Sequence, residues 1–206
     1  MIHRTLSSGL ALALALGLVA CGPGEPEENM EADSVEAPAT PPADAGQPPA
    51  GAGGMPSWFR VTGNQVEMDV VAGATPEGQY WNFNGARNGA MTVTVPQGAQ
   101  VTIRFRNDDP NMVHSIGVAP YAATPPAAPP AEPVFAGAVS PNATSPTDAT
   151  RTGQMATITF TADQPGEYAL YCYVPGHAVA GMWVRFNVGG TPGVTGAPAG
   201  VNITME

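Results

Sequence analysis

The sequence predicts an all-β fold, and within that class a β-sandwich, preceded by a disordered N-terminal tether. From Trp58 onward, short runs of β-branched and aromatic residues are separated by Gly, Pro, Asn and Asp, which is the pattern of strands joined by turns. Several runs alternate apolar and polar residues, and no stretch of eleven residues has a helical period. The runs predicted as strands are 66–72, 80–84, 91–95, 100–107, 113–118, 156–162, 167–173 and 182–188. Many short strands of this kind, expected to pair antiparallel, favour a sandwich.

The alternation predicts which side chains face the core. In 100–107, the apolar residues Val101, Ile103 and Phe105 are expected to face inward, while the Thr and Arg residues between them face water. In 156–162 the same pattern alternates small or apolar residues with threonine. Residues 119–150 are rich in Ala, Pro, Ser and Thr and are expected to form a long surface excursion, functional or disordered.

Residues 1–20 are predicted to be a bacterial lipoprotein signal peptide. Arg4 supplies a positive start, and the apolar run 10–20 is eleven residues long, whereas a membrane-spanning helix needs about 20. The run ends in Leu18-Val19-Ala20-Cys21, which resembles a lipobox and implies cleavage before Cys21 and lipidation of its sulfur. The alternative is an ordinary secretory signal with a chance cysteine. Either signal predicts a protein outside the cytoplasm, and the lipobox predicts one anchored in the cell envelope, facing the periplasm or the cell exterior.

The mature chain is divided by composition into three parts. Residues 21–57 are expected to be the lipidated cysteine and an acidic, Pro/Ala-rich linker, with seven acidic residues, no basic residue and no aromatic residue. Residues 58–190 are the predicted folded domain. Residues 191–206 are expected to be a loose tail, in which 201–204 could add an edge strand.

The charge of the chain excludes some partners. The formal net charge is −10, with seven Arg and no Lys against 17 acidic residues. Nucleic acid and anionic lipid surfaces both require basic clusters, so the only membrane contact expected is the lipid at Cys21. A negative carrier favours protein partners with basic docking faces, and we expect a monomer.

Cysteine and histidine point to a metal site. If Cys21 carries lipid, Cys172 is an unpaired thiol in a compartment where disulfides form readily. Its presence there is explained by burial, catalysis or metal binding. It lies in a C-x4-H-x4-M segment with His177 and Met182, and the other mature histidine is His114. One thiolate, two imidazoles and a weak thioether are the donors of a blue-copper site. Zinc and a Cys–His nucleophile pair are alternatives that leave Met182 unexplained.

This segment also carries a family resemblance. The stretch YCYVPGHAVAGMW resembles the copper loop of the cupredoxins and is most like that of sulfocyanin, and YWNFNGARNGAMTVTVPQGAQVTIRFRN and NMVHSIGV are similar to the upstream half of the domain. The resemblance covers roughly residues 78–188. It implies a cupredoxin-like Greek-key β-sandwich with one type 1 copper ion bound by His114, Cys172, His177 and, axially, Met182.

The resemblance has two further implications for the site. Electrons would cross at a partly exposed ring edge of His177, within a patch formed by Pro175 and 178–181. Ser115 occupies a position that is often Asn in cupredoxins, where the Asn side chain ties the ligand loop. Serine can still donate a hydrogen bond and is expected to lie behind the ligands, so this departure bears on the tuning of the metal and not on its binding.

These observations predict a type 1 blue-copper protein that transfers one electron at a time in a respiratory chain and is not an enzyme. Its expected partners are redox proteins such as a c-type cytochrome, a terminal oxidase or a reductase. The alternative is a periplasmic copper-delivery or storage protein, which would need an open, exchangeable site. A copper nitrite reductase would need further histidines that the mature chain lacks.

Overall fold

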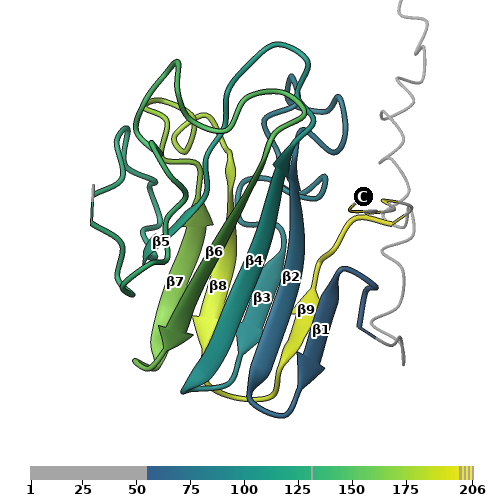
Figure 1. Cartoon of the computed structure of the whole chain (residues 1–206), viewed down its shortest axis with the longest axis vertical. Helices are drawn as coiled ribbons and strands as arrows, with labels where there is room; N and C mark the ends of the chain where they lie inside the picture. The colour runs from purple at the N-terminus through teal and green to yellow at the C-terminus, as the bar shows by residue number, and fades with distance from the viewer. Residues whose placement is uncertain (1–54, 131, 200, 202, 204, 206) are drawn as a thin grey trace, which may run out of the picture. The chain divides into compact units, whose positions relative to one another are not determined.

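The computed structural model describes residues 55–130, 132–199, 201, 203 and 205, all within Ala50–Glu206, one of two units of the chain (Figure 1). The predicted signal peptide 1–20, the predicted lipidation site Cys21 and nearly all of the predicted linker lie outside the described residues. Among those described, no helix is long and apolar enough to cross a membrane.

The described residues form strands and loops, with no helix, so the predicted all-β class is confirmed. The strands are β1 (Phe59–Thr62), β2 (Gln65–Ala72), β3 (Thr92–Val95), β4 (Ala99–Asn107), β5 (Gly117–Pro120), β6 (Met155–Ala162), β7 (Gly166–Tyr171), β8 (Trp183–Val188) and β9 (Gly193–Thr195).

The strands form two sheets that stack as a sandwich (Figure 1), in the orders β1-β2-β4-β6 and β5-β7-β8-β3-β9. From β2 to β7 the chain passes from one sheet to the other at every connection, which produces the predicted Greek-key arrangement. The expected antiparallel pairing holds for five strand pairs of the described residues, but β2 pairs with β4, and β3 with β8, in parallel. Parallel neighbours arise here because the connecting strands lie in the opposite sheet.

The core lies between the sheets, as the alternation predicted. Val101, Ile103 and Phe105 of β4 are all 0% exposed. Across the sandwich, the rings of Phe160 in β6 and Phe186 in β8 meet edge to face with centroids 6.1 Å apart. Burial of each large apolar side chain stabilises the fold by about 1.5–3 kcal/mol, and this rigid core supports the loops at the ends of the strands.

Two predicted strands were wrong in part or in whole. Residues 80–84 form a turn in which only Phe83 makes isolated bridges, because Tyr80 and Asn84 have left-handed φ values of 67° and 50°. In 113–118, β5 begins only at Gly117, and His114 makes an isolated bridge with Thr150. Aromatic and β-branched residues gave both segments strand-like composition, but their side chains pack as loops over the end of the sandwich.

The long excursion 119–150 packs against the domain. Phe135 is 3% exposed and stacks on Phe160 with centroids 5.5 Å apart. Earlier in the excursion, the carbonyl of Ala127 accepts a 2.7 Å hydrogen bond from the Gly176 amide. The excursion therefore contacts both the core and the segment that holds the predicted metal ligands.

Residues 191–206 contain the edge strand β9, which pairs with β3 in antiparallel register. Within 201–204, the two described residues, 201 and 203, lie outside any strand.

Candidate metal centre

The structure brings the four predicted ligands together at the end of the sandwich where β7 ends and β8 begins. Cys172 follows β7 directly, Met182 precedes β8 directly, and His177 lies on the loop between them. His114 comes from the segment before β5. The backbone ties the loop closed, because the Met182 amide donates to the His177 carbonyl (3.0 Å) and the Cys172 amide donates to the Met182 carbonyl (3.1 Å).

The spacing of the C-x4-H-x4-M segment produces a compact double turn. The His177 amide donates to the Val174 carbonyl (3.1 Å), and the Ala180 amide donates to the Gly176 carbonyl (3.1 Å). Gly176 and Gly181 have φ values of 88° and 107°, which favour glycine. At Gly181, a Cβ atom would also overlap the side-chain oxygen of Asn88, which would have to move.

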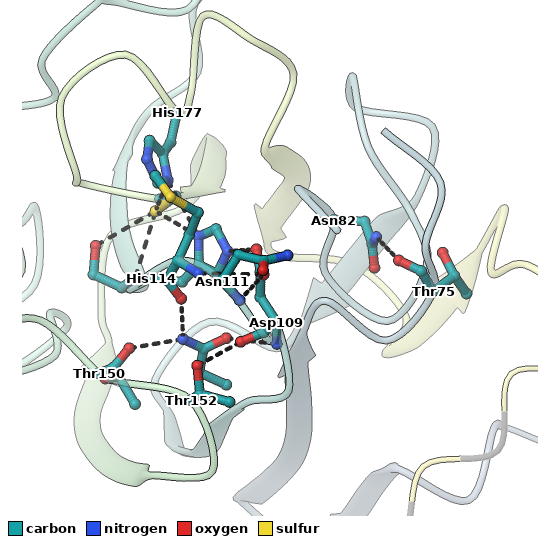
Figure 2. Close-up of polar contacts among 12 residues, drawn as sticks. Thr75, Asn82, Asp109, Asn111, His114, Thr150, Thr152 and His177 are labelled. Atoms are coloured by element: carbon teal, nitrogen blue, oxygen red, sulfur yellow. Dashed lines mark hydrogen bonds and ion pairs between the residues drawn. The ribbon is translucent and has the colours of Figure 1, made fainter. Parts of the chain in front are cut away.

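Three donor atoms, two from this loop and one from the His114 segment, lie close together. The Nδ1 atoms of His114 and His177 lie 3.1 Å apart, and the Cys172 Sγ lies 3.5 Å from the His177 Nδ1 and 3.9 Å from the His114 Nδ1 (Figure 2). His114 and Cys172 are 0% exposed, and His177 is 3% exposed. A single buried cation would therefore be within reach of all three donors.

The triangle of donors has the dimensions of a metal site. Bond lengths of about 2.0 Å to nitrogen and about 2.3 Å to sulfur, as found for zinc, place trigonal donors about 3.5 Å (N to N) and about 3.7 Å (N to S) apart. The three observed separations, 3.1, 3.5 and 3.9 Å, scatter around these values. The donors present thus fit a bound metal ion.

Met182, the predicted fourth ligand, lies next to these donors through its backbone. It is 0% exposed and its backbone is bonded to both Cys172 and His177. Zinc sites favour four strong ligands, whereas one thiolate, two imidazoles and a weak thioether suit copper in both oxidation states. The cofactor of this centre is one type 1 copper ion.

Burial sets the protonation of the metal-free site. It raises the pKa of the Cys172 thiol to about 11, although hydrogen bonds from Ser115 oppose the shift. The pKa of His177 is lowered to about 4, mainly by burial and to a smaller extent by the neighbouring His114. Burial also lowers the pKa of His114, against the opposite effect of Asp109. The imidazoles are therefore neutral and ready to bind at pH 7, while the thiol must release its proton to solvent as the metal binds.

Ser115 lies directly behind the sulfur, where it was expected. Its amide donates to the Cys172 Sγ (3.4 Å), and its hydroxyl lies 3.6 Å from the same atom. The hydroxyl oxygen also accepts hydrogen bonds from the amides of Tyr173 (2.9 Å) and Val174 (3.2 Å). One serine thus joins the His114 segment to the cysteine end of the ligand loop.

Asp109 is a site residue that sequence reasoning missed. Its carboxylate is fully buried and lies 2.7 Å from the Nε2 of His114, on the side of the ring away from the other donors (Figure 2). The one signal in the sequence was an acidic residue five positions before a predicted ligand, at the end of a strand. That signal is weak, because acidic residues are common in turns.

Trp81 is a second residue that was missed. Its ring stacks on His177 with centroids 4.1 Å apart and an interplanar angle of 21°. His177 is consequently only 3% exposed, so the expected partly exposed ring edge was wrong. Of the predicted patch, Pro175, Val179 and Ala180 are exposed, whereas Ala178 and Gly181 are buried.

Comparisons with known proteins agree with this geometry. The model of the sulfocyanin (SoxE) domain matches residues 59–197. No curated protein sequence matches the chain.

Among solved structures, rusticyanin from Thiobacillus ferrooxidans is 24% identical, with 64% of this chain and 86% of rusticyanin covered and a TM-score of 0.40. Auracyanin A, a blue copper protein from Chloroflexus aurantiacus, is 22% identical, with 60% and 98% covered and a TM-score of 0.41. The family is shown by the sulfocyanin domain, which spans most of the chain. The chain belongs to the sulfocyanin family of cupredoxins.

Proposed function

We propose that this chain is a one-electron carrier of the cell envelope, anchored by lipid at Cys21, that passes electrons between redox proteins of a respiratory chain. Bound copper supplies the Cu(I)/Cu(II) couple, and His114, Cys172, His177 and Met182 would hold it. The observation that carries the proposal is the convergence of three buried donor atoms within 4.8 Å of one another.

The surroundings of the donors favour electron transfer over other copper chemistry. The ligand loop is closed by its own backbone hydrogen bonds, and Ser115 ties it to the His114 segment. Donors held this firmly move little between oxidation states, which lowers the reorganisation on electron transfer. The full burial of Cys172 and the 3% exposure of His177 also leave little room for a substrate at the metal. We therefore infer a carrier rather than an enzyme.

The route of the electron would cross the face around Trp81 and Val179. Trp81 covers His177, and Val179 is 53% exposed on the ligand loop. The exposed residues of the loop itself, Pro175, Val179 and Ala180, are uncharged. A partner such as a c-type cytochrome, a terminal oxidase or a reductase would meet these uncharged residues with the Arg87 guanidinium beside them, where it donates to the Ala180 carbonyl (2.7 Å).

A copper-delivery or storage role gains no support from this arrangement. Delivery requires an open site from which a partner or chelator can take copper quickly. Three ligands that are 0–3% exposed, one of them covered by an indole ring, oppose fast exchange.

The test is a visible absorption spectrum of the full chain, purified in detergent, after loading with Cu(II) and removal of the excess. We expect an intense charge-transfer band that ascorbate bleaches and that Cys172→Ser abolishes. The matched control is Cys21→Ser, which removes the other cysteine and leaves the band unchanged. A copper-loaded chain without such a band would refute the proposed carrier function.

The anchor has its own test. In bacterial cells supplied with labelled palmitate, the chain is expected to acquire label and to fractionate with membranes. Cys21→Ser should abolish the label and release the chain into the soluble fraction. Labelling that survives this substitution would contradict lipidation at Cys21.

A further inference from the structure

Asp109 accepts hydrogen bonds on both of its carboxylate oxygens while being 0% exposed. Oδ2 lies 2.7 Å from the His114 Nε2. Oδ1 accepts from the backbone amides of Asn111 (2.8 Å) and Met112 (3.3 Å). Figure 2 shows these contacts as dashed lines around Asp109. Two N–H donors therefore point at Oδ1, which suits an ionised carboxylate.

The position of Asp109 is fixed by its own backbone. Its amide donates to the Asn107 side chain (2.9 Å), and its carbonyl accepts from the Thr152 hydroxyl (2.6 Å). Gly73 packs directly beneath, where a Cβ atom would come within 2.7 Å of the Asp109 backbone nitrogen. These contacts fix the backbone of Asp109, and the hydrogen bonds from the Asn111 and Met112 amides to Oδ1 hold its carboxylate beside His114.

The contact with Asp109 determines which nitrogen of His114 has a lone pair available to bind the metal. A carboxylate oxygen can only accept, so the Nε2 of His114 must carry the proton that it donates. The Nδ1 lone pair then points toward the Cys172 Sγ and the His177 Nδ1, at 3.9 and 3.1 Å. Hydrogen bonds of this kind orient ligating imidazoles and make them better donors.

We propose that Asp109 is a positioning residue of the copper centre and that its buried negative charge favours the Cu(II) state, lowering the reduction potential. The inference rests on the copper function proposed above. An amide cannot replace the carboxylate, because an amide oxygen turned toward His114 would leave the amides of Asn111 and Met112 facing an NH₂ group. Asp109→Asn therefore removes both the charge and part of the hydrogen-bond network.

The experiment is a redox titration of the copper-loaded full chain. For Asp109→Asn, we expect the visible band to remain and the ratio of Cu(II) to Cu(I) affinity to fall by about 10- to 100-fold, which for one electron raises the potential by about 59–118 mV. Asp108→Asn is the matched control. It removes the same charge from the next residue, but that side chain is 37% exposed and pairs with Arg106, so we expect a much smaller shift.

A second measurement keeps the inference testable if Asp109→Asn fails to fold. In the reduced wild-type chain labelled with ¹⁵N, the Nε2 proton of His114 should be visible, shifted downfield and protected from exchange. Its absence, or equal potentials for the Asp109→Asn and Asp108→Asn chains, would overturn the role of Asp109. Failure of the wild-type chain to show a thiolate–copper band would instead refute the proposed function itself.

Discussion

Replacing Ser115 by alanine should both weaken the fold and lower the reduction potential. The Ser115 hydroxyl oxygen accepts hydrogen bonds from two buried amides, those of Tyr173 and Val174. Because the oxygen is occupied as an acceptor, its own proton is free to point at the Cys172 Sγ, 3.6 Å away. Alanine removes the acceptor and the donor together.

The magnitude follows from the number of groups left without a partner. A buried N–H that loses its acceptor costs about 1–3 kcal/mol, so two of them predict a loss of about 2–6 kcal/mol in the free energy of unfolding. The hydroxyl donor favours the reduced state, where the thiolate carries more negative charge. Loss of one hydrogen bond of about 0.5–1.5 kcal/mol lowers the potential by about 20–65 mV for one electron.

The assay is urea denaturation of the metal-free chain at pH 7, followed by redox titration of the copper-loaded chain. Ser140→Ala is the matched control, because the Ser140 hydroxyl is also buried and accepts from one amide, that of Ile116 (3.1 Å). We expect this control to lose about 1–3 kcal/mol and to keep the wild-type potential. If Ser115→Ala matched Ser140→Ala in both quantities, the reasoning about the hydroxyl would be wrong.

Three further predictions concern the ligand loop and its cover. Met182→Leu preserves the volume of a fully buried side chain, so the visible band should remain. Loss of a weak donor to Cu(II) should raise the reduction potential in a redox titration. An unchanged potential would exclude Met182 as a ligand. Burial, followed by the neighbouring His114, lowers the pKa of His177 from 6.5 to about 4, so the unfolded metal-free chain binds a proton that the folded chain does not. Its free energy of unfolding, measured in urea, should therefore fall as the pH drops from about 6.5 towards about 4, and a flat profile over this range would contradict the burial of a neutral imidazole. Trp81→Ala uncovers the ring of His177 and should accelerate copper loss to a chelator. Trp81→Phe keeps a stacking ring and should lose copper at a rate closer to that of the wild type. Equal rates for the two variants would show that the stack does not protect the site.

The ligand loop was predictable from sequence because its information is local. Cys172, His177 and Met182 are close in the chain, and two glycines permit the turns that close the loop. The strand β4 was equally predictable, since strict alternation leaves one arrangement in which its apolar residues reach the core. His114 lies 58 residues before Cys172, and it was predicted from the scarcity of histidine and the family resemblance rather than from any local pattern.

The cover of the site was not predictable in this way. Residues 80–84 have the aromatic composition of a strand, and only the left-handed backbone of the turn places the Trp81 ring on His177. The contact joins two segments far apart in the sequence, and no periodicity relates them.

The sequence by itself determined the all-β class, the inward face of β4 and the spacing of the candidate ligands Cys172, His177 and Met182, because alternation and short-range spacing express local geometry. Only the tertiary structure decided that Asp109 stands behind His114 and that Trp81 shields His177 from solvent. Both depend on where two sheets place the ends of separate strands and loops, and that placement comes from packing of the whole core rather than from neighbouring residues.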